Sequence, residues 1–584
     1  MASQNEEAAL FACTKCRSMK LKCDRMKPYC GRCARRSETC DYPHSRRTNV
    51  GRTTRVRELE VKLDQLESLA RPTNKPLDNS NIMDHSTGFS AGDSPLLSDM
   101  IGHTASSTAS NAGGPAVGTW SAELLPTGTT EQRLPPEVLE YLTDSYFDKW
   151  HHVAPMLHQT HYTMSLQLPP HMRPPMCLQY IVMAWGAEMG KTHRHLSFPF
   201  YQRARAYAAA DEIKDIVTLA HAQMWCLMCY FEAHYLLFSR SSISISRAIR
   251  IAQMLGLHRV DADDLESIYL MPPPQSWLEA EERRRTWWAL YCSDRLVGGT
   301  TGLPVLINEQ EISARLPASE AAFETGAEEI TSLWTSTFQP EGQEFSPFAR
   351  RVLAASLFHQ AFLNSDLGVR NEDHGSSRTS MYWNRHREID NNLVLLLQAL
   401  PDDTKLPKQI RCRNATFVNI IIHMSTICLH RAAISKMKVL DLPQNMIRRS
   451  RARLVCAAEE ILTIFRMMSD VDENLKNSIL TFSIYMVSQV LLEDLDPEEE
   501  NLSRQDNLDF ILRLMILSAR TLHNPVTLSM AVQLAVEMSQ RGLNSTPVEA
   551  ALELLFTHTL TPVFTKDSTP SSNIIFRLPV SYQV

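Results

Sequence analysis

The stretch CTKCRSMKLKCDRMKPYCGRCARRSETC, from Cys13 to Cys40, holds six of the thirteen cysteines of a 584-residue chain. A shift of seventeen residues places its first three cysteines on its last three, so the stretch duplicates a Cys-x2-Cys-x6-Cys unit. So short a segment cannot bury a core that would hold it together. The fold of this region must therefore come from the cysteines, which are Cys13, Cys16, Cys23, Cys30, Cys33 and Cys40.

Metal binding is the chemistry that this repeat favours. The chain has no secretory signal at its start and no window of eighteen consecutive apolar residues, so we expect an intracellular protein with no membrane partner. In that reducing environment, clustered cysteines are more often metal ligands than disulfides. A redox-active cysteine patch and a zinc-storage segment are the alternatives, but neither requires the repeat or the basic residues between the cysteines.

Ligand counting indicates two zinc ions. Structural zinc takes four ligands in a tetrahedron, so the three thiols of one half cannot complete a site. Two ions need eight bonds, which six thiolates supply if two of them bridge both metals. The internal pseudo-symmetry makes Cys13 and Cys30 the expected bridging pair, and the metal bonds would supply most of the folding free energy.

Charge is distributed unevenly along the chain. The net charge is −6, but residues 11–57 contain fourteen Lys and Arg against three Asp and Glu, a balance of +11 that leaves −17 for the remainder. A basic head on an acidic body is typical of a protein whose head binds a polyanion. Between the second and third cysteines, the first half reads RSMKLK without an acid, whereas the second half reads ARRSET. We therefore expect the first half to face the phosphate backbone and reach base edges in the major groove.

These residues resemble the fungal zinc binuclear cluster family of transcription regulators, whose pattern is the same six-cysteine ladder with a basic first loop. The resemblance implies two zinc ions and a module that reads CGG triplets in double-stranded DNA. It implies that Lys20 makes the main base contacts and that Arg17 and Lys22 hold phosphates, with Pro28 in the loop between the halves. Met19 departs from the family, which commonly has a basic residue there. Lys15, Arg46 and Arg47 complete the candidate DNA-binding set.

A short coiled coil is predicted after the basic linker. In RVRELEVKLDQLESLA, positions a and d of consecutive heptads are apolar, with Arg and Lys at g and Glu at e. This pattern favours a parallel homodimer, as the family resemblance also implies, whereas a single amphipathic helix on the protein's own surface is the alternative. The seam residues are Val56, Leu59, Leu63 and Leu66.

The rest of the chain separates into a polar segment and a large helical body. Residues 71–133 are dominated by Ser, Thr, Gly, Asn and Pro, a composition typical of a disordered linker. Apolar residues then recur with helical period, as in ISRAIRIAQMLGLHR, which places Ile245, Ala248, Ile249, Ala252 and Leu255 on one face and ends at Gly256. The sequence therefore predicts a mostly α protein.

Two stretches of the body resemble the regulatory middle domain of the same family. They are YFDKWHHVAPMLHQTHY, residues 146–162, and EAEERRRTWWALYCSDRLVGGTTGLPVLINEQEISARLP, residues 279–317. The resemblance implies a domain that restrains or transmits activation, sometimes in response to a small-molecule effector. The charged run from Glu281 to Arg285 is interpreted as a solvated helix face with internal ion pairs rather than as a nuclear localisation signal.

The predicted organisation has seven parts. They are a flexible tail at 1–12, a zinc cluster at 13–43, a basic linker at 44–54, a coiled coil at 55–70, a disordered linker at 71–133, a helical regulatory domain at 134–540 and a C-terminal segment at 541–584. In the last segment, Thr546-Pro547-Val548-Glu549 forms a capping box before an apolar helix. That helix is either the last packed helix or part of an activation region that contacts the transcription machinery.

The function that these features indicate is zinc-dependent, sequence-specific regulation of RNA polymerase II transcription in the nucleus. We expect a homodimeric activator of a metabolic or secondary-metabolite gene cluster. A repressor, or a heterodimeric regulator of primary carbon or nitrogen metabolism, is the alternative. Enzyme classes lack support, because the chain has no His-Glu-x-x-His or Gly-x-Ser-x-Gly motif, and its WGAEMGKT has Trp185 where a phosphate-binding loop needs glycine.

Overall fold

The computed structural model of the chain describes residues 12–42 except 20 and 38, and residues 134–554 except 263–269, 335–344, 371–375, 401–405, 409, 470, 494–501 and 523. The chain divides into two compact units, one within residues 1–91 and the other within residues 92–584. The predicted basic linker, coiled coil and disordered linker lie outside the described residues. So do their candidate site residues, which are Arg46, Arg47, Val56, Leu59, Leu63 and Leu66.

Within its described residues, the N-terminal unit contains two helices of five residues each, α1 (Thr14–Ser18) and α2 (Gly31–Arg35). Each helix begins directly after a cysteine whose sulfur accepts a hydrogen bond from the backbone N–H three residues later. Helices this short are unstable alone in water, because nucleation costs more than one turn returns. The two halves of the repeat therefore have the same local structure and the same need for an external cross-link.

The second unit is built from helices, and among its described residues no strand occurs beyond one isolated bridge between Arg315 and Leu333. The prediction of a mostly α protein is confirmed. Its α-helices are α5 (Pro136–Lys149), α6 (Gln159–Ser165), α7 (Met176–Met189), α8 (Ser197–Ile213), α9 (Leu219–His234), α10 (Phe238–Met254), α11 (Trp277–Thr301), α12 (Glu320–Thr325), α13 (Pro347–Arg370), α14 (Ser376–Gln398), α15 (Arg413–Val439), α16 (Gln444–Met467), α17 (Val471–Asn474), α18 (Ser478–Glu493), α19 (Leu502–Leu522), α20 (Pro525–Gln540) and α21 (Thr546–Leu552).

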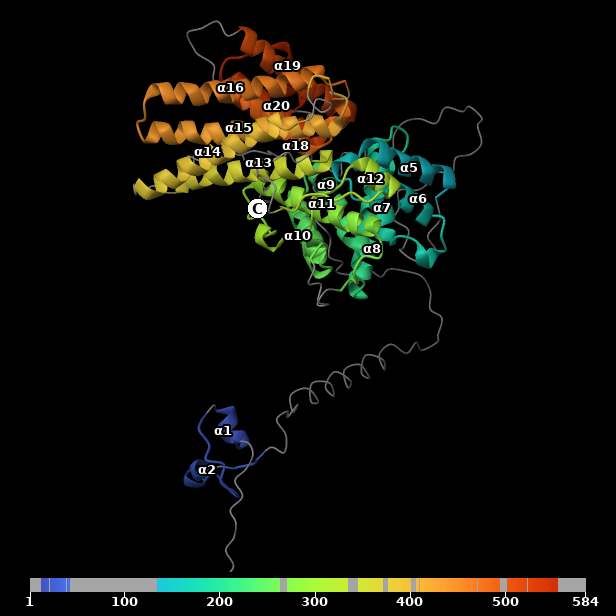
Figure 1. Cartoon of the computed structure of the whole chain (residues 1–584), viewed down its shortest axis with the longest axis vertical. Coiled ribbons are helices and arrows are strands. Elements are labelled where there is room, and N and C mark those ends of the chain that lie inside the picture. The colour runs from blue at the N-terminus through green and yellow to red at the C-terminus, as the bar shows by residue number, and fades with distance from the viewer. Residues whose placement is uncertain are drawn as a thin grey trace, which may run out of the picture. The chain divides into compact units, whose positions relative to one another are not determined.

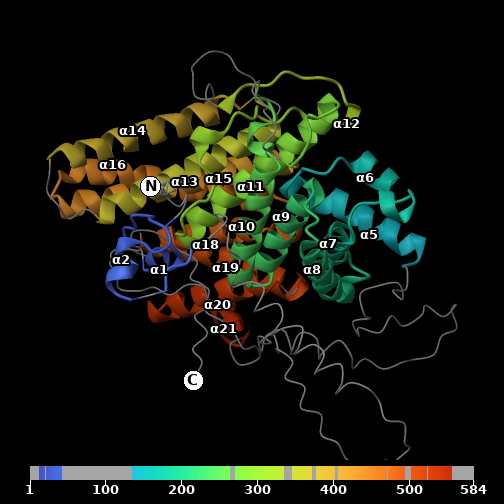
Figure 2. The same ribbon diagram turned by 90° about the horizontal axis from the view of Figure 1, so that it is seen from below.

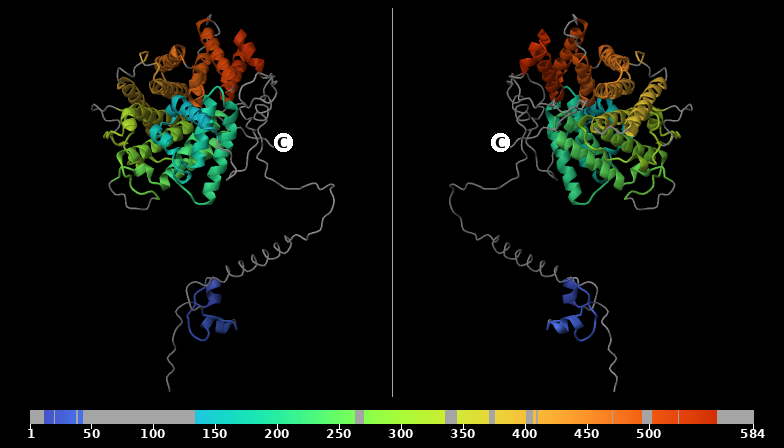
Figure 3. Two further views of the ribbon diagram at one scale, coloured as in Figure 1. Left: turned by 90° about the vertical axis from the view of Figure 1, so that its right-hand side faces the viewer. Right: turned by 90° about the vertical axis from the view of Figure 1, so that its left-hand side faces the viewer.

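Three groups of helices share one large apolar core. The first group contains α5 and α7–α10, and α11 joins it to α13. The long helices α13–α16 lie side by side (Figure 1), with α15 packed against both α13 and α16. Helices α18–α21 form the last group (Figure 2), and Figure 3 shows its red members at the top of the unit.

The sequence periodicity of α10 is confirmed by its packing. The five residues expected on one face are all buried, and the helix ends before Gly256, which adopts a left-handed backbone conformation at φ 77°. Helix α7 likewise ends at Gly190, with Trp185 buried inside it, as expected of a helix end rather than a phosphate-binding loop.

Helix α15 is long and apolar enough to cross a membrane by length and composition alone. However, 78% of its apolar window is buried inside the helical unit. It packs between α13 and α16, and its buried residues lie around most of its circumference. A helix that is apolar all round and covered by neighbours is typical of the centre of a large soluble core.

The interpretation of the charged run on α11 as a solvated face is wrong. Glu281 and Arg285 are fully buried, and Arg284 is nearly so. Arg284 donates two hydrogen bonds from Nε and one from Nη2 to the carboxylate of Asp261 at 2.7–3.0 Å. Arg285 donates from Nε to Glu281 at 3.1 Å. The expected ion pairs exist, but they lie within the protein rather than in water.

These buried pairs fasten an irregular segment to α11. The Nη2 of Arg285 donates to the carbonyl of Ala318 at 2.9 Å, and Glu281 accepts from the Ala318 N–H at 2.8 Å. The Nη1 of Arg285 also donates to the carbonyl of Pro155 at 3.1 Å. Burial raises the pKa of the Glu281 carboxyl, and the adjacent cations of Arg285 and Arg284 oppose this shift. The charged run thus provides hydrogen-bond partners for backbone groups of an irregular segment, which pair with no strand or helix backbone.

The C-terminal helix α21 packs into the same unit. Its Pro547, Val548 and Ala551 are buried, and it contacts both α19 and α20. The helix begins after Ser545, one residue earlier than the predicted cap. Residues 541–554 are thus continuous with the helical unit, whereas residues 555–584 lie outside the described part of the chain.

We predict that Arg285→Ala lowers the free energy of unfolding of the helical unit by about 3–5 kcal/mol, because it removes one of the two cations that pair with the buried Glu281 carboxylate and leaves the buried carbonyls of Pro155 and Ala318 without this donor. Arg247→Ala removes an exposed arginine paired with Glu212 and should cost less than about 1 kcal/mol. Urea unfolding followed by circular dichroism at 222 nm measures both. Equal, small losses would contradict the buried clamp.

Candidate metal centre

The six cysteines of the repeat converge in the N-terminal unit. Their sulfurs form two overlapping sets of four, and within each set all ligand atoms lie within 4.8 Å of one another. One set contains Cys16 and Cys23, the other contains Cys33 and Cys40, and both contain Cys13 and Cys30. Two shared thiols between two four-ligand sets are the arrangement that two bridging thiolates require.

The distances between sulfurs distinguish metal binding from disulfide bonding. The Sγ atoms of Cys13 and Cys30 are 3.8 Å apart, as are those of Cys13 and Cys33 and those of Cys16 and Cys30. A disulfide bond would bring two sulfurs to about 2.05 Å. Tetrahedral zinc with bonds of about 2.3 Å places neighbouring sulfurs about 3.8 Å apart. The spacing therefore fits zinc.

The chemistry of the donor set also fits two divalent cations. Burial raises the pKa of the Cys13 thiol, whereas the N–H of Cys33 is the main cause that lowers the pKa of Cys30 to about 6. Six thiolates this close would repel one another, and two zinc ions would reduce their summed charge to −2. Each ion would have four sulfur ligands and no open position, so the centre would be structural rather than catalytic.

Three residues that the sequence interpretation did not single out hold the halves together. The carboxylate of Asp24 accepts the N–H of Gly31 at 2.8 Å, at the start of α2. A Cβ on Gly31 would lie 2.5 Å from that carboxylate, so no larger residue fits without a shift. The hydroxyl of Tyr42 donates to the carbonyl of Met26 at 2.6 Å, and the Tyr42 side chain packs on the cysteines. In the sequence, the glycine directly after the ligand Cys30 indicates a close contact at the start of the second half.

The basic residues of the first half lie on the surface. Lys15, Arg17 and Lys22 are all exposed, around α1 and the turn that follows it. Met19 is also 53% exposed on this face. Lys20, the predicted base-reading residue, lies outside the described residues. The metal centre thus carries a positively charged face on its first half.

Comparisons with known proteins agree with this geometry. A family model described as the fungal Zn(2)-Cys(6) binuclear cluster domain matches residues 11–49. A second, described as the fungal specific transcription factor domain, matches residues 143–363.

The chain contains the zinc cluster domain and the regulatory domain of fungal zinc binuclear cluster transcription factors. It is therefore a transcription factor rather than an enzyme, its cofactors are two zinc ions, and its N-terminal module is a DNA-binding domain. The second match covers both stretches that resemble the regulatory middle domain, so that resemblance is confirmed as well.

Curated relatives named as transcription regulators are similar to the chain, two of them over most of its length. The citrinin biosynthesis transcriptional activator of Monascus ruber is 25% identical over 482 residues, which cover 79% of this chain and 92% of the relative. The pigment biosynthesis transcriptional activator of the same species is 24% identical over 518 residues, which cover 84% and 88%. The asperfuranone cluster transcription factor of Emericella nidulans is 30% identical over 236 residues, 37% and 35% of the two chains. No solved structure matches the chain.

We predict that Cys13→Ser removes both zinc ions, because this thiol belongs to both ligand sets. Cys456→Ser, which alters an exposed cysteine of the helical unit, should retain two. Inductively coupled plasma mass spectrometry of the purified chains counts the zinc. Two ions retained by the Cys13→Ser protein would refute the shared-ligand arrangement.

Proposed function

We propose that this transcription factor is a nuclear, zinc-dependent activator that binds CGG-type half-sites upstream of a secondary-metabolite gene cluster transcribed by RNA polymerase II. The observation that carries the proposal is the pair of overlapping four-sulfur sets beneath an exposed basic face. A small module with this charge and a rigid metal scaffold is suited to dock one short helix in the major groove.

The two halves of the module would have different roles on DNA. Lys15, Arg17 and Lys22 project from the surface of the first half, where they would contact phosphates and fix the orientation of α1. Lys20 lies within the same segment and would donate to the O6 and N7 acceptors of guanine in a CGG triplet. The zinc ions would hold α1 and the following turn in place, so that the cations form one surface only in the metal-bound protein.

A homodimer is the proposed binding form. The heptad seam of Val56, Leu59, Leu63 and Leu66 would join two chains in parallel. Each chain would then place one module on one CGG triplet, and the basic linker at 44–54, with Arg46 and Arg47, would set the spacing of the triplets and add phosphate contacts. Nuclear import through these same basic residues would bring the protein to its sites.

The assignment to a gene cluster and to activation is supported by the relatives. Two of them are named transcriptional activators of citrinin and pigment biosynthesis, and each is similar over about four-fifths of this chain. The helical unit, which contains the fungal specific transcription factor domain at 143–363, would restrain or transmit activation, as the family resemblance implies. The predicted C-terminal segment at 541–584 is the candidate contact with the transcription machinery, in particular residues 555–584, which lie outside the described part of the chain.

We predict that Lys20→Ala weakens binding to a CGG-containing duplex by about 1–3 kcal/mol and binding to random duplex DNA by much less, because base contacts carry the sequence preference. Lys27→Ala removes an exposed lysine outside the first-half loop and should affect both duplexes equally and slightly. Fluorescence anisotropy titrations at one salt concentration measure all four affinities. Equal losses on both duplexes for Lys20→Ala would exclude base readout by this residue.

A further inference from the structure

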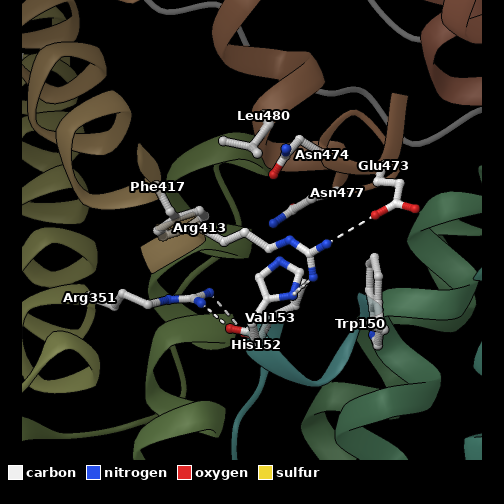
Figure 4. Close-up of a pocket in the computed structure, with 10 residues that line it drawn as sticks. All are labelled: Trp150, His152, Val153, Arg351, Arg413, Phe417, Glu473, Asn474, Asn477 and Leu480. Atoms are coloured by element: carbon white, nitrogen blue, oxygen red, sulfur yellow. Dashed lines mark hydrogen bonds and ion pairs between the residues drawn. The ribbon is translucent and has the colours of Figure 1, made fainter. Parts of the chain in front are cut away.

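A small cavity lies inside the helical unit, far along the sequence from the metal centre. It is formed where the 3-10 turn η1 (His151–Val153) meets α13, the start of α15 and the segment from Glu473 to Leu480 (Figure 4). Its volume is about 10 Å³, the space that roughly one water molecule needs. The lining residues are Trp150, His152, Val153, Arg351, Arg413, Phe417, Glu473, Asn474, Asn477 and Leu480.

Arg351 forms the buried side of this cavity and is only 3% exposed. Its guanidinium donates to the carbonyls of His152 and Val153, the latter at 2.8 Å, and to the side-chain oxygen of Asn414 at 3.0 Å. Its Nε is buried and has no acceptor among the described residues. The ring of Phe417 covers the guanidinium at 4.2 Å. A buried cation is thus held by neutral groups, with one donor left over.

Two other buried arginines of the unit differ from Arg351, because each contacts two carboxylates. Arg284 contacts Asp261 and Glu281, and Arg295 contacts Asp294 and Glu309. Burial lowers the pKa of both arginines, but Asp261 and Glu281 raise the pKa of Arg284 above its usual value. Tyr291, followed by Glu309 and Asp294, does the same for Arg295.

Burial lowers the pKa of Arg351, and Cys292, Tyr230 and the carboxylate of Glu320 oppose this shift only in part. No carboxylate forms an ion pair with Arg351 in the part of the chain that the structure describes. A fully desolvated cation without a counter-ion is costly, so an anion at this place would stabilise the fold.

A second arginine adds to the positive charge. The guanidinium groups of Arg351 and Arg413 both point toward His152 (Figure 4). Arg413 pairs with Glu473 at 3.0 Å, but Glu473 also accepts from Lys149 at 3.3 Å. One carboxylate therefore serves two cations, and Arg351 remains without one.

His152 contributes no charge of its own to the cluster. Burial, together with the cations of Arg413 and Arg351, lowers its pKa well below the usual range, so the imidazole is neutral. The three cations and one carboxylate of this cluster leave a net charge of about +2. The N-terminus of α15 adds a partial positive charge, since Cys412 provides no side-chain cap.

The cavity has a partly exposed edge, formed by Arg413 and Glu473, and a buried base, formed by Arg351. The side chains of Arg413 and Glu473 are 26% and 31% exposed, whereas Arg351 is covered. An incoming group would meet Arg413 first and Arg351 last. The small volume admits one oxygen-sized atom at the base, so the rest of a ligand would lie near the exposed edge.

We propose that this cavity binds the anionic oxygen of a small oxyanion, a carboxylate or a phosphate, between Arg351 and Arg413. A planar guanidinium with a free Nε–H suits such an oxygen, because charge-assisted hydrogen bonds are short and strong. The bound anion would join η1, α13, α15 and the α17–α18 segment, which meet at this place. It would thereby stabilise one arrangement of these elements over others.

The test uses the full-length chain in a chloride buffer. Inorganic phosphate, sodium succinate and additional sodium chloride are added at matched ionic strength, and the melting temperature is recorded. Saturable stabilisation by phosphate alone identifies a phosphate ligand, and stabilisation by succinate alone identifies a carboxylate ligand. An identical response to all three salts overturns the proposal.

Two variants and one control locate the site. Arg413→Gln should lower the affinity for the stabilising anion, phosphate or succinate, about tenfold or more in isothermal titration calorimetry. Arg431→Gln removes an arginine of the same helix that pairs with Glu493 and should leave the affinity unchanged. Equal affinities of the two variants contradict the site.

Glu473→Gln gives an outcome of opposite sign. It removes the carboxylate that competes for Arg413, so the anion should bind several-fold more tightly, whereas a merely structural role for this salt bridge predicts no gain. This variant decides the matter if Arg413→Gln fails to fold, and unchanged or weaker binding would then overturn the proposal.

Discussion

Bonds between thiolates and zinc are the interaction on which the DNA-binding unit depends. The helices α1 and α2, described between residues 12 and 42, have five residues each, and the sulfurs of Cys13 and Cys30 cap their first turns. The six sulfurs form two sets of four that share Cys13 and Cys30, and the printed separations of 3.8 Å among four of them fit two tetrahedra with a common edge. The metal therefore fixes the backbone and the basic surface together, and a change that removes one is expected to remove the other.

In the helical unit, buried charged side chains pair with backbone groups of irregular segments. Its core is apolar, but irregular segments cross it and bring backbone groups that helices cannot pair. Buried charges of α11 pair these groups, as Arg285 and Glu281 do with both backbone polar groups of Ala318. Arg351 does the same for the carbonyls of His152 and Val153. The difference is that Arg351 has no carboxylate, and this makes its surroundings a candidate site rather than a structural clamp alone.

Local patterns made much of this predictable. The cysteine spacing contains its own ligand geometry, and the period of Ile245 to Leu255 identifies the buried face of α10. The environment of the run from Glu281 to Arg285 was mispredicted, because its ion pairs look the same in sequence whether water or a distant loop surrounds them. The cavity beside Arg351 had no local signal, since its carbonyl partners lie about two hundred residues away along the chain.

Selection of bound sequences from a pool of random duplex DNA tests the central claim most directly. The zinc-loaded, full-length protein should enrich sequences that contain two CGG triplets at one fixed spacing, since each module of the proposed dimer would read one triplet. The metal-free protein should enrich none. A selected pool without CGG triplets, or the same enrichment with and without zinc, would contradict the account.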